Sequence, residues 1–292
     1  MVRKSKDDFF HWHGDRTDSF CVFLWFFISI AMMLFSFAGN RRESPKRFLV
    51  FSQLCVFFGN IALAAVGIYK VQLYGEKVAP RSKCKLIISN HNCAIEVILI
   101  WVLSHFPSFV SRRENCKFPF FSGIIKACDG VLVDRSSASS RQRTLEAIIE
   151  HAEDPSSSQL IIFPEGTTGN QRTLFLFRKG AFEAGVPVQM ICVYFPYKHF
   201  NPAWTGRETG GNNLKDIALR LCSQFVTHAE VRVLPVYYPT EEEKANAIVY
   251  ANHCQKMMAC VLKEKVSDAT TKYAKEAAAA YEQKKKMSNQ QQ

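Results

Sequence analysis

His91 and Glu96, a histidine and a glutamate five residues apart, are the first candidates for acid–base chemistry in this sequence. His91 comes two residues after the apolar run 85–89. On a straight helix the two side chains would lie about 140° apart, and on a single strand they would face opposite sides of the sheet. The carboxylate therefore reaches the imidazole only if His91 lies in a turn after a strand and Glu96 lies in the first turn of the following helix.

In that arrangement the pair would act as a general base. Glu96 would hold one ring nitrogen of His91 in its protonated form, and the other nitrogen would be free to take a proton from an alcohol. The alternative is an N-capping turn whose histidine happens to be buried. The spacing alone leaves both interpretations open.

Two further strand ends carry polar side chains. The run 163–168, Phe-Pro-Glu-Gly-Thr-Thr, ends an apolar strand. Gly166 would let a polar ligand approach the backbone closely, and Glu165 and Thr167 offer hydrogen bonds to hydroxyl groups. Arg135, at the end of another apolar run, could clamp a phosphate with two hydrogen bonds or pair with a nearby acid. Taken alone, the run 163–168 is better explained as an ordinary turn with a capping threonine.

The elements around these residues predict the fold class. Short β-rich runs alternate with longer helical stretches, which indicates an α/β fold with helices packed on a mostly parallel sheet. We expect strands at 85–89, 130–134, 159–163, 186–195 and 230–236, and helices at 93–104, 142–152 and 214–225. Thr240 and Glu243 have the spacing of a capping box, which predicts a further helix running to about residue 265.

The N-terminal part of the chain is strongly apolar. Residues 20–39 and 48–69 contain no charged side chain, and each stretch has about the 20 residues that a helix needs to cross a bilayer. They predict a membrane-embedded helical hairpin, which either spans the bilayer twice or enters and returns. The expected division is a polar segment at 1–19, the hairpin at 20–70, a catalytic domain at 71–265 and a basic, partly disordered tail at 266–292.

The charge and the cysteines narrow the function class. A net charge of +11 suits an anionic partner, and with an apolar anchor present we expect membrane lipids and not nucleic acid. The ten cysteines include no C-x-x-C pair, so neither a disulfide framework nor a zinc site is expected.

Taken in order, four blocks resemble the glycerolipid acyltransferase family, which includes the lysophosphatidic acid acyltransferases. The blocks are Asn90-His91 through Glu96, 130–135 ending in Arg135, the Phe-Pro-Glu-Gly-Thr run at 163–167, and Val-Pro-Val at 186–188. Runs at 194–196 and 234–244, together with Trp204, are similar to the lysophosphatidylcholine acyltransferase branch. The resemblance covers roughly residues 80 to 262.

This resemblance implies a function. His91 would be the general base, oriented by Glu96, and the acceptor's phosphoglycerol part would be bound by Arg135, Glu165, Gly166 and Thr167. Acyl-CoA would be the co-substrate, without a cofactor or metal, and lysophosphatidylcholine, lysophosphatidylethanolamine or lysophosphatidic acid the acceptor. The family implies an intracellular membrane, the endoplasmic reticulum, with the catalytic domain facing the cytosol.

The sequence departs from the family at one position. The family usually has aspartate where this chain has Glu96, which keeps the charge and adds one methylene, about 1.5 Å. The departure motivates one alternative, a catalytically impaired lipid-binding or membrane-organising homologue. A second alternative makes Cys93 the nucleophile beside His91, although residues two apart seldom face each other on a helix.

Overall fold

The computed structural model describes residues 30, 39–93, 95–117, 119–133, 138–198, 200–204, 214–269, 276, 279–280 and 283. A seven-stranded sheet forms the centre of this part of the chain. Its strands lie in the order β1 (Val71–Gly75), β8 (Ala229–Tyr237), β7 (Val188–Tyr194), β2 (Leu86–Ser89), β5 (Leu160–Ile162), β3 (Ser108–Arg112) and β4 (Val131–Val133).

The sheet is mostly parallel, as the alternating pattern predicts. β2 is parallel to both of its neighbours, β5 and β7, and β3 is parallel to β5 and β4. The exception is β8, which runs antiparallel to β7 and has β1 as its parallel neighbour on the other side. The carboxyl ends of β2, β5 and β7 therefore meet at one edge of the sheet, where α/β proteins bind ligands.

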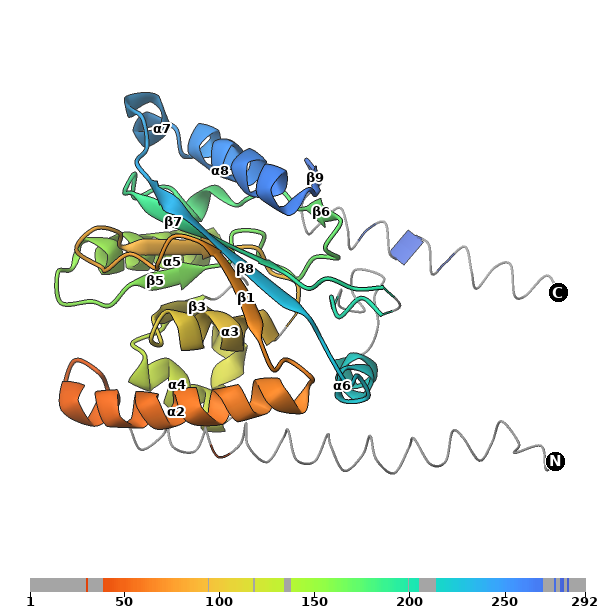
Figure 1. Cartoon of the computed structure of the whole chain (residues 1–292). Helices are drawn as coiled ribbons and strands as arrows, with labels where there is room; N and C mark the ends of the chain where they lie inside the picture. The colour runs from red at the N-terminus through yellow and green to blue at the C-terminus, as the bar shows by residue number, and fades with distance from the viewer. Residues whose placement is uncertain are drawn as a thin grey trace, which may run out of the picture.

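Both faces of the central strands are buried. Along β2, Ile87 packs into the core on one face, whereas Leu86 and Ile88 pack into the core on the other. The first face is covered by α2 (Pro45–Ala65), α3 (Ile95–Leu103) and α4 (Pro119–Ala127), and the second by α5 (Ala138–Glu153) and α8 (Ala247–Leu262) (Figure 1). Burial on both faces explains why these strands are continuous apolar runs.

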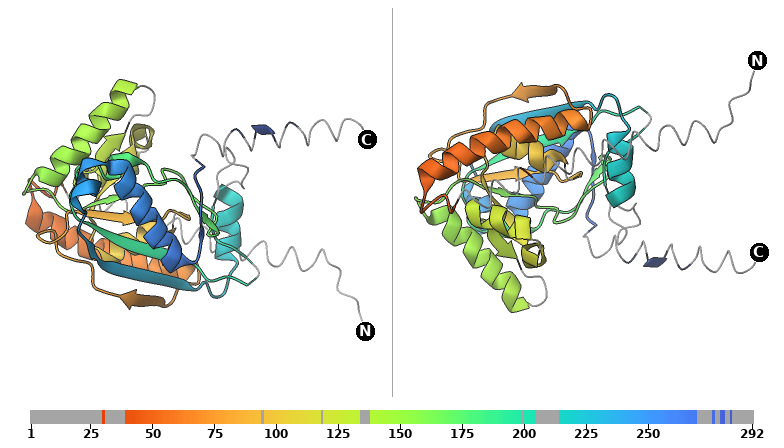
Figure 2. Two further views of the ribbon diagram at one scale, coloured as in Figure 1. Left: turned by 90° about the horizontal axis from the view of Figure 1, so that it is seen from above. Right: turned by 90° about the horizontal axis from the view of Figure 1, so that it is seen from below.

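Helix α2 contains most of the second apolar stretch. It packs beside α3, and Phe48, Cys55 and Leu63 enter the core (Figures 1 and 2). Large apolar side chains on its outer side, Leu49, Val50, Leu54 and Phe57, are exposed. Among the described helices it alone has the length and composition that could cross a membrane, which agrees with membrane association. The first apolar stretch, apart from Ile30 and Gly39, lies outside the described residues, so the hairpin stays a prediction.

The remaining elements lie around this sheet. A short 3-10 helix, η1 (Arg113–Lys117), follows β3; a second, η2 (Lys179–Ala181), precedes β7; and α6 (Leu214–Cys222) precedes β8. The predicted helix after Thr240 is two helices, α7 (Glu241–Ala245) and α8. The break lies at Asn246, whose side chain accepts hydrogen bonds from the first amides of α8 and so begins a new helix. The strands β6 (Thr173–Leu174) and β9 (Lys265–Val266) pair as a separate two-stranded sheet.

Candidate active site

The turn between β2 and α3 brings His91 and Glu96 together. β2 ends at Ser89, α3 begins at Ile95, and Glu96 is the second residue of the helix. His91 Nδ1 and Glu96 Oε1 are 2.5 Å apart, a short hydrogen bond. This is the strand–turn–helix geometry that the spacing of the two residues requires.

Glu96 also caps its own helix. Its side chain is fully buried. Oε1 accepts a hydrogen bond from the backbone amide of Asn92 at 2.8 Å, and Oε2 accepts one from the backbone amide of Cys93 at 2.6 Å. Amides at a helix N-terminus lack partners within the helix and favour a negative charge. The two interpretations that the spacing left open, a capping turn and a His–Glu pair, are thus both realised by one carboxylate, which these hydrogen bonds hold in place.

The imidazole ring of His91 lies at the rim of the site. The side chain is 24% exposed, and its ring stacks on Phe163 with centroids 4.5 Å apart and planes inclined by 29°. Because Nδ1 is bound to Glu96, Nε2 is the nitrogen available to a substrate at this partly open position. Phe163 comes from the end of β5, so the second motif orients the ring of the first.

Glu165 joins the two motifs through their backbones. Oε1 accepts a hydrogen bond from the His91 amide at 3.0 Å, and Oε2 accepts one from the Phe175 amide at 3.0 Å. The Gly169 amide in turn donates to the carbonyl of His91 at 2.6 Å. Burial raises the pKa of the Glu165 carboxyl to about 8, against the effect of these hydrogen bonds. The described contacts of Glu165 position His91, and its predicted contact with an acceptor stays a prediction.

Two asparagines connect the turn to β7. The side chain of Asn90 donates to the carbonyl of Val193 and accepts from the amide of the same residue, each at 2.8 Å. Asn92 donates to that carbonyl as well, at 2.9 Å, and its own carbonyl accepts a hydrogen bond from the Trp204 amide at 2.7 Å. The asparagine before the histidine is therefore a structural part of the motif.

Gly166 has a backbone conformation that favours glycine, with φ of +66°. A Cβ atom at this position would lie 2.5 Å from Nε of Arg178, so the absence of a side chain lets Arg178 cross the loop.

Thr167, the next residue, is half-buried. Arg135 lies outside the described residues. The stretch 174–182, which ends in Arg178-Lys-Gly-Ala-Phe182, also looks like the family, but the sequence assigned Arg178 no role.

The thiol of Cys93 is unsuited to act as a nucleophile. Cys93 is buried, and burial together with the neighbouring Glu96 carboxylate raises the pKa of the thiol well above its usual value. The reactive form of cysteine is the thiolate, which this environment disfavours. Of the two candidates, the environment thus disfavours Cys93 and leaves His91.

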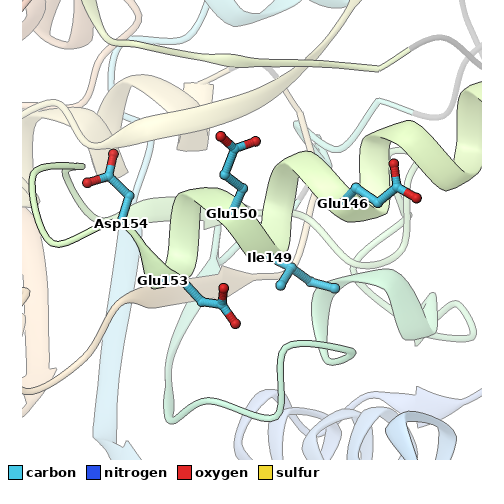
Figure 3. Close-up of a pocket in the computed structure, with 5 residues that line it drawn as sticks. All are labelled: Glu146, Ile149, Glu150, Glu153 and Asp154. Carbon is cyan, nitrogen blue, oxygen red and sulfur yellow. The ribbon is translucent and has the colours of Figure 1, made fainter.

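A surface hollow on α5 is unsuited to phosphate-bearing ligands. Figure 3 shows its lining residues, Glu146, Ile149, Glu150, Glu153 and Asp154. Its four carboxylates would repel a phosphate-bearing ligand. In the part of the chain that the structure describes, no three His, Cys, Asp or Glu residues are placed to hold a metal ion.

Comparison with known proteins shows what the chain is similar to. Residues 70–194 match the family profile "Acyltransferase". The chain is 34% identical over 197 residues to lysophospholipid acyltransferase LPCAT4 of Xenopus tropicalis, which covers 67% of this chain and 37% of the relative. It is 35% identical over 207 residues to lysophosphatidylcholine acyltransferase 1 of Rattus norvegicus, which covers 70% of this chain and 38% of the relative. The chain thus spans about two fifths of the length of these curated relatives.

A solved structure shares the fold. The crystal structure of the 1-acyl-sn-glycerophosphate acyltransferase PlsC of Thermotoga maritima superimposes with a TM-score of 0.58 at 19% identity. The match covers 88% of this chain and all of the other one. The likeness therefore extends well beyond the four motifs to the sheet and its flanking helices.

Proposed function

Residues 70–194 make this chain a member of the acyltransferase family, and we propose that it transfers a fatty acyl chain from acyl-CoA to the free glycerol hydroxyl of a lysophospholipid. The observation that carries the proposal is the hydrogen bond between His91 Nδ1 and the buried carboxylate of Glu96, at the carboxyl edge of the parallel strands. Lysophosphatidylcholine, lysophosphatidylethanolamine and lysophosphatidic acid are the candidate acceptors.

In the proposed mechanism, His91 acts as the general base. Nε2 takes the proton from the acceptor hydroxyl as its oxygen attacks the thioester carbonyl carbon, and Glu96 stabilises the imidazolium that forms. The tetrahedral intermediate then expels coenzyme A as a thiolate, breaking the C–S bond, and the proton passes from Nε2 to this sulfur. A thiol has a pKa of about 8–9, so its thiolate leaves without strong acid catalysis, and the direct transfer needs no acyl-enzyme.

The length of Glu96 suits this role. Glu96 Oε1 lies 2.5 Å from His91 Nδ1, and the same carboxylate accepts hydrogen bonds from two backbone amides of the turn. This geometry supports an active pair and argues against the alternative of an impaired lipid-binding homologue. We assign Glu165 to positioning His91, and Gly166, Thr167 and Arg135 to the phosphoglycerol part of the acceptor.

The proposed substrates are amphiphilic, so the site must open toward a lipid surface. The exposed apolar side chains of α2 support a location at a membrane, because an apolar helix face gains free energy by leaving water. We propose a hairpin at 20–70 that anchors a catalytic domain at 71–265, with this domain on the cytosolic side of the endoplasmic reticulum membrane.

The test is acyl transfer by the purified full chain in detergent. Labelled acyl-CoA is offered with a panel of lysophospholipids to the wild type, to His91→Ala, and to His253→Ala as a matched control from outside the site. We expect labelled phospholipid from the wild type and the control, and a loss of about 10²–10⁴-fold or more in His91→Ala. Binding of acyl-CoA and lysolipid by a wild type that forms no product would instead favour the lipid-binding homologue.

A further inference from the structure

We propose that Arg178 binds a phosphate group of the substrates in this site, with Gly166 as the surface on which its side chain lies. The inference rests on the proposed function and adds to it a residue to which neither the motifs nor the comparisons assign a role. Both the acceptor and coenzyme A carry phosphate, so either can supply the ligand.

The side chain of Arg178 follows the backbone of the Gly166 loop. An ideal Cβ on Gly166 would lie 2.5 Å from Nε, 3.0 Å from Cζ and 3.2 Å from Cδ of Arg178. The main chain of Arg178 is held there too, because its amide donates to the carbonyl of Pro164 at 2.9 Å. The guanidinium therefore lies over the glycine that the motif places next to Glu165.

This position is close to the proposed base. Glu165, which precedes Gly166, accepts the backbone amide of His91, and Gly169 donates to the His91 carbonyl. Arg178 is an exposed residue, so a ligand that arrives from solvent or from a membrane surface can meet its guanidinium. A planar guanidinium with several donors suits a phosphate, with which it forms two parallel hydrogen bonds.

The segment that presents Arg178 is held by the C-terminal part of the domain. β6 pairs with β9, and the Leu176 amide donates to the carbonyl of Ala269 at 3.2 Å. The buried side chain of Gln255, on α8, donates to the carbonyl of Phe175 at 2.9 Å. Because its supporting backbone is fixed in this way, Arg178 meets a ligand with little further ordering, which favours binding.

The neighbouring residue provides a matched control. Lys179 carries the same charge, but its side chain is 61% exposed. Its Nζ forms an ion pair at 2.6 Å with Glu183, four residues along the chain. A purely long-range effect of positive charge would be lost in Lys179→Gln as well as in Arg178→Gln. An effect confined to position 178 requires the local geometry.

The first experiment compares Arg178→Gln, Arg178→Lys and Lys179→Gln in the full chain. KM is measured for acyl-CoA and for lysophospholipid separately, each with the other saturating. We expect Arg178→Gln to raise KM for one of the two substrates about 10- to 100-fold, the size of a lost hydrogen bond to a charged group. The substrate affected identifies the source of the phosphate. Arg178→Lys should recover part of the loss, and Lys179→Gln should match the wild type.

A second variant tests the role of the glycine. Gly166→Ala places a methyl group where Arg178 lies, so it should raise the same KM as Arg178→Gln. The double variant should then be no worse than the poorer single variant, apart from a fall in Tm that the positive φ at residue 166 predicts for any side chain. Fully additive losses would contradict the proposed contact.

Binding measurements separate this inference from the proposed function. Coenzyme A and a lysophospholipid in detergent are titrated into His91→Ala with and without Arg178→Gln, so that turnover is not needed. Weaker binding of one ligand in the double variant supports the phosphate site even if the wild type transfers no acyl group. Unchanged binding and unchanged KM in Arg178→Gln, or a fall in kcat alone, would overturn it.

Discussion

Two histidine–glutamate pairs of nearly equal geometry lie at opposite edges of the sheet. Nδ1 of His91 is 2.5 Å from Oε1 of Glu96, and Nδ1 of His253 is 2.7 Å from Oε1 of Glu243. The pairing registers of β2 and β8 with β7 show that the two histidine–glutamate pairs lie at opposite ends of the strands. Ser89, before the first pair, lies beside Ile191 inside β7, whereas Tyr237, before the second, lies beside Val188 at the start of β7.

The surroundings of the two pairs differ more than the pairs themselves. Glu243 forms a capping box with Thr240 and accepts a hydrogen bond from the hydroxyl of Tyr237. The side chain of its partner, His253, is 49% exposed on a helix surface. His91 instead stacks on Phe163 and lies where the ends of the parallel strands meet. A carboxylate-bound histidine therefore marks an active site only together with neighbours that can hold a substrate. The predictions that follow test this difference, from the largest expected effect to the smallest.

Exchanging each glutamate for glutamine should separate the two pairs. In Glu96→Gln, one amide nitrogen must face an N–H donor, since His91, Asn92 and Cys93 all donate to this side chain. We expect kcat to fall about 10²–10⁴-fold, as when a base loses the group that orients it. Glu243→Gln should leave kcat unchanged and lower only Tm. Similar losses of kcat in both variants would show that the difference is not functional.

Two buried glutamates, Glu165 beside the first pair and Glu243 within the second, should respond to pH with opposite signs. Burial raises the pKa of Glu165 from 4.5 to about 8, so the unfolded chain releases this proton first as pH rises. The contribution of Glu165 to the free energy of unfolding is therefore full below pH 4.5 and declines as pH rises through about 8. Glu165→Gln should destabilise by about 1–3 kcal/mol, because an amide group would face a backbone N–H, and should lack this pH dependence. Urea unfolding across this range measures both.

For Glu243 the sign reverses. Burial opposes its ionisation, but the Thr240 amide, His253 and Tyr237 hold the pKa of Glu243 below its ordinary 4.5. Its stabilising effect is thus full above pH 4.5 and is lost as pH falls through the lowered folded value. The wild type should exceed Glu243→Gln by about 1 kcal/mol at neutral pH, the usual value of a helix cap, and the gap should close in acid. A gap that widened in acid would contradict the assigned contacts.

Shortening the first carboxylate should lower kcat much less than replacing it with glutamine. Glu96→Asp withdraws the oxygens by about 1.5 Å, which the turn can absorb only in part because two backbone amides also depend on them. We expect kcat to fall by roughly a factor of ten or less, about 1.4 kcal/mol. A gain in kcat would mean that glutamate at this position lowers activity, and steady-state kinetics beside Glu243→Asp provide the comparison.

The sequence predicted the elements that have strong local patterns. The apolar runs became β2, β4, β5, β7 and β8, and the Thr240–Glu243 capping box is confirmed. β1 and β3 escaped prediction because their strand conformation depends on pairing with β8 and β5, which local propensity does not encode. The direction of β8 was likewise not predictable from its own residues.

Within the site, residue type was easier to predict than orientation. The spacing of His91 and Glu96 permitted contact between the two side chains in one arrangement only, and the structure has that contact. For Glu165 the sequence indicated hydrogen bonds to substrate hydroxyls, which stays a prediction, and no local pattern foretold the hydrogen bonds that its two oxygens accept from backbone amides. Arg178 is twelve residues from Gly166, and the supporting backbone depends on contacts with residues near 265, so no local signal could reveal that the two residues meet.

Because β6 pairs with β9, parts of this protein can fold only in a certain order during translation. The segment that leads to Arg178 finds its partners, Lys265, Val266 and Ala269, only when nearly the whole domain has left the ribosome. β2 and β5 can pair much earlier, because both are complete by residue 162. A nascent chain would thus hold His91 beside Glu96 before the loop around Arg178 is fixed. Residues 265–269, among the last to be synthesised, are therefore those that complete the site.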